Sequence, residues 1–253
     1  MSKKIVLGGQ LTLEEFMAVV RDHAEVALSE EYCERIRKCR AMVERCVEEE
    51  RVVYGTTTGF GRLVSQIISK EQAATLQKNI VLTHSVSVGE PFGEEETRAI
   101  ILMALQSMGC GYSGVRLEIA ERYVAFLNLN LLPYSPKHGS VGYLNVEGHI
   151  AACAIGEGKA FYQGELMSSK EALAKAGLEP LVLSYKEGLA ILNGTISASA
   201  LASFSASTLV FIVSALVLTV STLVLIVSTL ILIVSTLIAV IIITTTSSIL
   251  RIS

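Results

Sequence analysis

The distribution of charge along the 253 residues is the feature that most constrains the fold. All 24 acidic residues and all basic residues except Arg251 precede Gly188, so residues 188–250 carry no formal charge. A charged segment can give each helix a solvated face, whereas an uncharged apolar segment cannot. The sequence therefore indicates two regions, a charged body and an apolar tail.

Within the body, apolar residues recur at the spacing of an α-helix. Thr12 and Glu15 form a capping box, which predicts a helix beginning at Leu13. The same periodicity predicts further helices over residues 31–51, 69–82, 94–108, 115–128, 149–156 and 168–176. Residues 88–91 are typical of a turn, and Pro133 and Pro136 of an extended connection. Because no alternating run is long enough for a large sheet, we expect a mainly α fold.

The cysteines and the net charge exclude several kinds of site. The helix over residues 31–51 has an apolar stripe that includes Ile36, Cys39, Met42, Val43 and Cys46. Cys39 and Cys46 lack partner ligands at short spacing, so we expect them to pack in the core and bind no metal. The chain has no CxxC pair and no export signal, which favours reduced thiols and a cytoplasmic body. A net charge of −3 predicts no nucleic-acid partner.

The glycine-rich stretch from Tyr54 to Gly61 is the strongest candidate for chemistry. Glycines let a backbone lie close to a ligand, and the phenol of Tyr54 is a candidate base. The alternative interpretation is a surface loop. His84, at the end of a predicted helix, is either a buried structural histidine or a substrate ligand, and its position alone does not separate the two.

Several blocks of the body, in order between Leu11 and Thr195, resemble the aromatic amino acid ammonia-lyase family. This family includes histidine and phenylalanine ammonia-lyases and related aminomutases. The blocks are Tyr54 to Gly61, Leu76 to His84, Val88 to Pro91, Ser113 to Arg116, Gly139 to Gly142, Ile155 to Gly158 and Lys186 to Thr195. One glycine block matches easily by chance, but an ordered series does not.

The resemblance implies an ammonia-lyase-like, mainly α region over residues 1–200. Its loop-bearing part is expected over 1–110 and the start of a truncated helix bundle over 111–200. It also implies a homotetramer and a small-molecule amino-acid substrate. The expected function is that of a carbon–nitrogen lyase, which removes a β-proton and eliminates ammonia from a histidine-like or aromatic amino acid.

The resemblance also assigns residues. Tyr54 is similar to the family base that takes the β-proton from a mobile loop. His84 matches a substrate-contacting histidine, and Asn193 an asparagine beside the prosthetic group. With Gly61 of the loop, these are the expected substrate-binding positions.

One departure from the family concerns the prosthetic group. Family members follow Gly-Ser-Val-Gly with Ala-Ser-Gly, which cyclises to the electrophile methylidene-imidazolone. Here Tyr143 follows Gly142, and no Ala-Ser-Gly occurs in the chain, so we expect no such cofactor. Two interpretations stay open. One is an ergothionase-like relative that expels trimethylamine, a leaving group that needs no electrophile. The other is an inactive, truncated homologue.

The tail, over residues 201–253, is a low-complexity segment with an apolar heptad repeat from Ser207 onward. A membrane contact is conceivable only through residues 204–250, which are long and apolar enough to span a bilayer. The favoured alternative is translated low-complexity DNA that replaces the genuine C-terminal half. In an inactive homologue the tail gives membrane association or aggregation at most.

Overall fold

A computed structural model describes residues 4–61, 64–139 and 144–209. The chain divides into two units, Met1–Phe204 and Ser205–Ser253. Most of the second unit, and with it most of the expected tail, lies outside the described residues, so the tail and its boundary stay predictions. The first unit is mainly helical, as the sequence predicts. Its helices are α1 Leu13–Val20, α2 Glu30–Glu48, α3 Lys70–His84, α4 Glu94–Gly109, α5 Leu117–Asn128, α6 Asn145–Ala154, α7 Ser169–Lys175 and α8 Glu187–Ile191.

Short strands complete the first unit. They are β1 Lys4–Leu7, β2 Glu25–Leu28, β3 Val88–Pro91, β4 Leu132–Pro133, β5 Pro136–His138, β6 Lys159–Tyr162 and β7 Glu165–Ser168. β1 and β2 form a parallel pair with α1 between them in sequence. α1 begins at Leu13 with the predicted capping box: the Glu15 N–H donates to the Thr12 hydroxyl, and the Glu15 carboxylate accepts from the Thr12 N–H.

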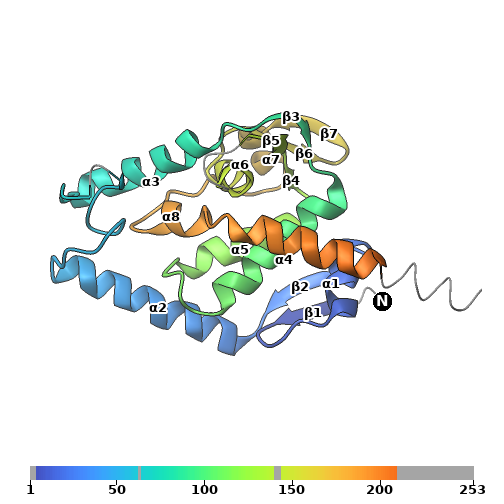
Figure 1. Ribbon diagram of the computed structural model, residues 1–253, viewed down its shortest axis with the longest axis horizontal. Coiled ribbons are helices and arrows are strands. Elements are labelled where there is room, and N and C mark those ends of the chain that lie inside the picture. The colour runs from blue at the N-terminus through green and yellow to red at the C-terminus, as the bar shows by residue number, and fades with distance from the viewer. Residues whose placement is uncertain (1–3, 62–63, 140–143, 210–253) are drawn as a thin grey trace, which may run out of the picture. The chain divides into compact units, whose positions relative to one another are not determined.

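The core of the unit is centred on α4, which packs against α1 and α5 (Figure 1). The guanidinium of Arg98 on α4 is fully buried. It donates to the carbonyl oxygens of Val19 and Leu127, at the ends of α1 and α5. Because the last carbonyls of a helix lack partners within it, one arginine satisfies the ends of two helices and fixes both to α4.

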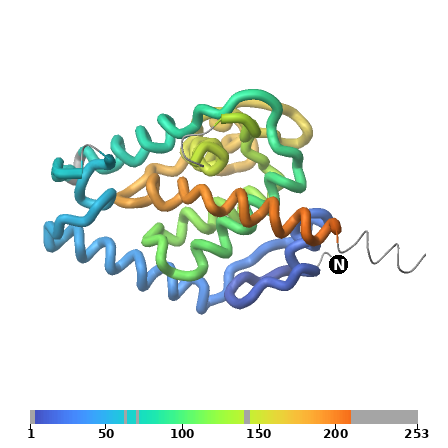
Figure 2. Tube along the Cα trace, viewed as in Figure 1, coloured from blue at the N-terminus to red at the C-terminus, as the bar shows by residue number. Residues whose placement is uncertain are grey.

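A second group of helices carries most of the candidate site. α3 packs against both α6 and α8. In Figure 1, α3 and α6 lie on one side of α4 and α5, and α2 lies on the other. Figure 2 shows a further helix that begins at residue 195, and its residues up to Ser203 line a pocket together with Gly9 to Leu13. The guanidinium of Arg21, the residue that follows α1, lies 5.5 Å from the ring centroid of Phe204, which links the end of α1 to this helix.

The structure corrects several sequence predictions. Residues 88–91 form strand β3 and not a turn, because they pair antiparallel with β5. The β6–β7 hairpin around Gln163 and Gly164 was not predicted. α6 begins at Asn145, before the predicted residue 149.

The predicted stripe on α2 is also partly wrong. The face that packs inward carries Tyr32, Ile36, Arg40 and Val43. Met42 is 57% exposed, and Cys39 and Cys46 are half-buried and line a surface pocket instead of the core.

Among the described residues, one helical stretch, Glu187–Leu209, is long and apolar enough to pass a length-and-composition test for a membrane span. The core helix of a soluble protein passes the same test. Glu187 is a fully buried carboxylate paired with arginines, and Ile191 and Ala200 are core residues. Glu187, Ile191 and Ala200 therefore anchor the first part of the stretch in the first unit, although only 28% of the apolar window is buried.

Candidate active site

The threonines of the glycine-rich loop face inward. Thr56, Thr57 and Thr58 are buried, whereas Tyr54 is 53% exposed. The Val53 N–H donates to the Thr57 hydroxyl at 2.9 Å, and that hydroxyl donates to the carbonyl of Arg51. The hydroxyls of Thr57 and Thr58 thus anchor the loop, whereas the phenol of Tyr54 is exposed.

The phenol of Tyr54 contacts its own loop. Its ring meets the Phe60 ring edge to face, with centroids 6.3 Å apart. The Gly61 N–H donates to the phenol oxygen at 3.5 Å. Gly61 therefore contacts the expected base directly, a relation that the sequence did not reveal.

The loop also contacts α8 through Gly55. This glycine has a φ of +65°, and a Cβ there would lie 2.6 Å from Cδ2 of Leu189. A side chain is excluded both by the backbone conformation and by the neighbouring leucine. The glycine therefore allows the loop to lie against the helix that leads to Asn193.

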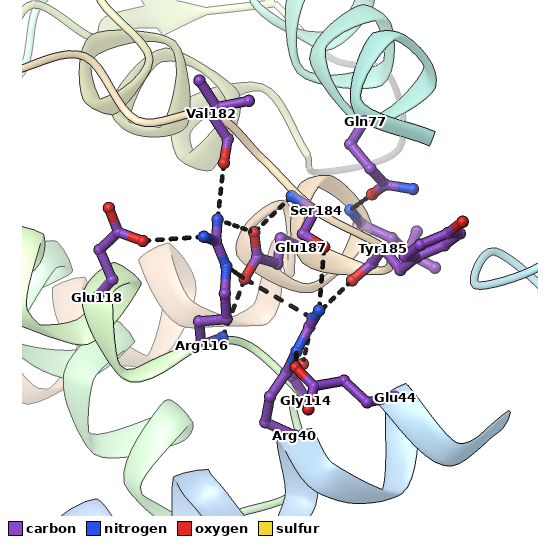
Figure 3. Close-up of polar contacts among 11 residues, drawn as sticks. Arg40, Glu44, Gln77, Gly114, Arg116, Glu118, Val182, Ser184, Tyr185 and Glu187 are labelled. Carbon is purple, nitrogen blue, oxygen red and sulfur yellow. Dashed lines mark hydrogen bonds and ion pairs between the residues drawn. The ribbon is translucent and has the colours of Figure 1, made fainter. Parts of the chain in front are cut away.

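A buried carboxylate fixes the start of α8 (Figure 3). Glu187 is fully buried and accepts hydrogen bonds from the backbone N–H, Nε and Nη2 of Arg116, at 3.0, 2.8 and 2.9 Å. The Ser184 N–H donates to it at 2.6 Å. The hydrogen bond with Glu187 raises the pKa of Arg116. These contacts hold together two of the family-like blocks, around Ser113 and Lys186.

Arg40 of α2 extends this network. Its Nη1 lies 3.8 Å from Glu187 and donates to the carbonyl oxygens of Gly114 and Tyr185. Gln77 of α3 contributes from the other side, because its side-chain oxygen accepts from the Leu189 N–H at 3.3 Å. α8 is therefore held by α2, by α3 and by the residues that precede α5, as Figure 3 shows.

Asn193 lies in the short non-helical segment between α8 and the helix over residues 195–209. Its side chain is exposed and accepts from the Thr195 hydroxyl at 3.1 Å. It lines a pocket of about 580 Å³, which we call the Asn193 pocket. Leu189, Leu144 and Ile80 line the same pocket.

His84 ends α3, one turn after Ile80. Its Nδ1 lies 2.7 Å from the carbonyl oxygen of Ile80. Because a carbonyl only accepts, Nδ1 carries the hydrogen and Nε2 is left for another contact. The side chain is half-buried, so neither the structural nor the substrate-ligand interpretation is excluded.

α6 carries two ionisable residues that contact neighbouring segments, the buried Glu147 and the half-buried His149. The Ser197 N–H donates to Oε1 of Glu147 at 2.8 Å, which ties α6 to the helix that follows Asn193. Burial raises the pKa of Glu147. His149 accepts from the Ser87 N–H through Nε2 at 3.1 Å, and burial lowers its pKa.

The sequence of this region lacks the tripeptide from which the family's prosthetic group forms. Only residues 140–144 stand between Gly139 and the start of α6 at Asn145. They read Ser-Val-Gly-Tyr-Leu and contain no Ala-Ser-Gly. Residues 140–143 lie outside the described residues, so the expected absence of the prosthetic group stays a prediction.

The expected site residues are thus only partly connected. The loop of Tyr54 and Gly61 contacts Leu189, and Leu189 and Asn193 line one pocket, but the described lining of that pocket includes neither Tyr54 nor His84. Sequence reasoning missed Arg40, Glu187 and Glu147. Apart from Glu44 near Arg40 and Ser184 near Glu187, their partners are 50 to 147 positions away in the chain, so no local motif marks them.

Comparisons with known proteins agree with this architecture. A family model described as aromatic amino acid lyase matches residues 11–229. The histidine ammonia-lyase of Caldanaerobacter subterraneus is 46% identical over 204 residues, which cover 79% of this chain and 40% of the relative. The chain thus spans about 40% of the length of the curated relatives that it matches.

Solved structures show the same fold. Phenylalanine aminomutase from Pantoea agglomerans superposes with a TM-score of 0.75 at 36% identity, covering 80% of this chain and 39% of its own. Ergothionase from Treponema denticola, described as an ergothioneine-degrading enzyme, has a TM-score of 0.76 at 30% identity, with coverages of 80% and 41%. Family model, relatives and fold agree, and the chain belongs to the aromatic amino acid lyase family.

Proposed function

We propose that this chain is a carbon–nitrogen lyase that eliminates an amine from a histidine-like or aromatic amino acid. One observation carries the proposal. The loop bearing Tyr54 has its threonines buried and its phenol exposed, and it lies against Leu189 of the Asn193 pocket. An exposed phenol on an anchored glycine loop, next to a pocket with an amide, suits removal of a proton from a bound ligand.

The proposed chemistry is a β-elimination. The deprotonated phenol oxygen of Tyr54 takes the β-proton, and the C–H electron pair forms the new carbon–carbon double bond. The Cα–N bond breaks and its electron pair leaves with the nitrogen. Since Tyr54 contacts Gly61 and does not line the described pocket, its exposed side chain moves toward the substrate before this step.

The finer part of the proposal concerns the leaving group. Without the family electrophile, the chain needs a substrate whose nitrogen leaves unaided. A quaternary trimethylammonium does so, because it departs as neutral trimethylamine with no proton transfer. The likeness to an ergothioneine-degrading enzyme supports a thiol-histidine betaine as substrate. The proposed enzyme therefore works without a cofactor. Its proposed location is the cytoplasm, and its proposed assembly is a homotetramer.

The test is a set of parallel incubations of the full chain with ergothioneine, histidine, phenylalanine and tyrosine. Absorbance follows the unsaturated acid, and separate assays measure ammonia and trimethylamine. We expect trimethylamine and unsaturated product in equal amounts from ergothioneine. Product from histidine with release of ammonia would support the lyase assignment but reject the leaving-group argument. No product from any of the four contradicts the proposal and favours an inactive homologue.

A further inference from the structure

Lys186 gives the Asn193 pocket a cationic group. It lines this pocket together with Asn193 and Ser113. Its backbone has a φ of +66°, a conformation that residues other than glycine rarely adopt. The contacts of its neighbours maintain this conformation, because the Ser184 N–H donates to Glu187 and the Tyr185 carbonyl accepts from Arg40. The place of Lys186 is therefore set by the buried network.

Gly114 provides room for the lysine side chain. A Cβ on Gly114 would lie 2.6 Å from Cγ2 of Val43 and 3.4 Å from both Cδ and Nζ of Lys186. The lysine side chain therefore passes over Gly114, the residue after Ser113, and its ammonium lies close to this glycine. Any side chain at position 114 would meet both neighbours, and the φ of +73° there also favours glycine.

The charge of Lys186 is not used by the network beside it. The nearby carboxylate of Glu187 already accepts from Arg116 and Ser184 and has Arg40 at 3.8 Å. Within the described parts of the chain, no ion pair includes Lys186. An ammonium in a pocket with apolar walls such as Ile80 and Leu144 attracts an anion more strongly than it does in open water.

We propose that Lys186 binds the carboxylate of the ligand in the Asn193 pocket, with Ser113 and Asn193 as neutral hydrogen-bonding groups beside it. This inference rests on the proposed function for the identity of the anion, an amino-acid carboxylate. Elimination leaves that carboxylate intact, so the unsaturated product also carries it. Binding can therefore be measured with the product, without turnover.

The experiment compares acids with their neutral amides. Trans-urocanate, trans-cinnamate and the primary amide of each are titrated calorimetrically into the full chain and into K186M, K186R and K38M. Lys38 is the matched control, because it lines a neighbouring pocket that Lys186 shares but not the Asn193 pocket. Circular dichroism and thermal unfolding verify that each variant is folded.

We expect K186M to weaken binding of an acid about 10- to 100-fold, since a hydrogen bond to a charged group contributes about 1.5–3 kcal/mol. Binding of the amides should not change, K186R should restore part of the loss, and K38M should behave as wild type. An equal loss for acid and amide, a similar loss in K38M, or no binding of either acid to the wild type overturns the assignment.

The outcome is separable from that of the proposed function. If K186M shows the acid-specific loss but no substrate is turned over, the carboxylate site stands and the lyase proposal falls. If elimination occurs and K186M keeps the wild-type KM, the lyase proposal stands and Lys186 is not the carboxylate ligand.

Discussion

His84 and His149 differ in which ring nitrogen the structure engages. The Nδ1 of His84 donates to a backbone carbonyl, so its Nε2 can meet a ligand. The Nε2 of His149 accepts from the Ser87 N–H, so a proton on that nitrogen would remove the bond. At the scale of single residues, hydrogen-bond partners thus favour His84 over His149 as the candidate for substrate contact.

His149 gives a prediction about pH. Burial lowers its pKa in the folded chain, so below the ordinary value of about 6.5 the unfolded chain binds a proton that the folded chain does not. The free energy of unfolding should therefore fall as the pH drops from about 6.5 toward the folded pKa. Urea unfolding at pH 7.5 and 5.5 measures this loss.

In H149Q the glutamine can still accept from Ser87 but does not titrate, so the loss should be smaller than in the wild type. The exposed His138 of β5 offers the control H138Q, which should keep the wild-type dependence. An unchanged loss in H149Q would show that other groups cause it.

At the scale of elements, α8 is placed by tertiary contacts more than by its own sequence. It is only five residues long and begins after a residue with positive φ. An isolated helix of this length is not stable in water. Glu187, Arg116, Arg40 and Gln77 hold it, and so they also set where Asn193 lies.

The buried ion pair between Glu187 and Arg116 predicts that two glutamate-to-glutamine substitutions lower the free energy of unfolding by unequal amounts. E187Q leaves the charges of Arg116 and Arg40 without their buried partner, and removal of one member of such a pair costs about 3–5 kcal/mol. E118Q removes an exposed partner of Arg116 at 2.9 Å, and such pairs contribute about 1 kcal/mol or less. Urea unfolding of both variants measures the difference, and equal losses would mean that the Glu187 network does not hold α8.

Sequence predicts elements here when their signals are local. The capping box of α1 lies within four consecutive residues, and the N-caps of α2 and α7 are single serines. The strands of the β1–β2 pair and of the β3–β5 pair are short and lie far apart in the sequence. No local pattern of residues therefore predicts that they pair. The site divides in the same way. A family-like loop and Asn193 could be found from motifs, whereas Glu187 and its arginines required the fold.

At the scale of the whole molecule, two features bear most on the candidate site: the length of the chain relative to its relatives and the number of copies that assemble. The chain matches about 40% of its curated relatives' length, and the described residues carry the loop, the Asn193 pocket and the network that supports them. In the proposed homotetramer, neighbouring copies can contribute further side chains to this pocket. Sedimentation equilibrium should give four times the mass of one chain. A monomer at all concentrations would contradict the proposed assembly.

The most direct test of the central claim is the elimination rate of Y54F. If Tyr54 is the base, loss of its hydroxyl should lower kcat about 10²- to 10⁴-fold with the substrate that the wild type turns over. The control is Y134F, which removes the hydroxyl of a tyrosine that donates to the Gly89 carbonyl, outside the loop and the pocket. Wild-type turnover in Y54F, or an equal loss in Y134F, would contradict the account.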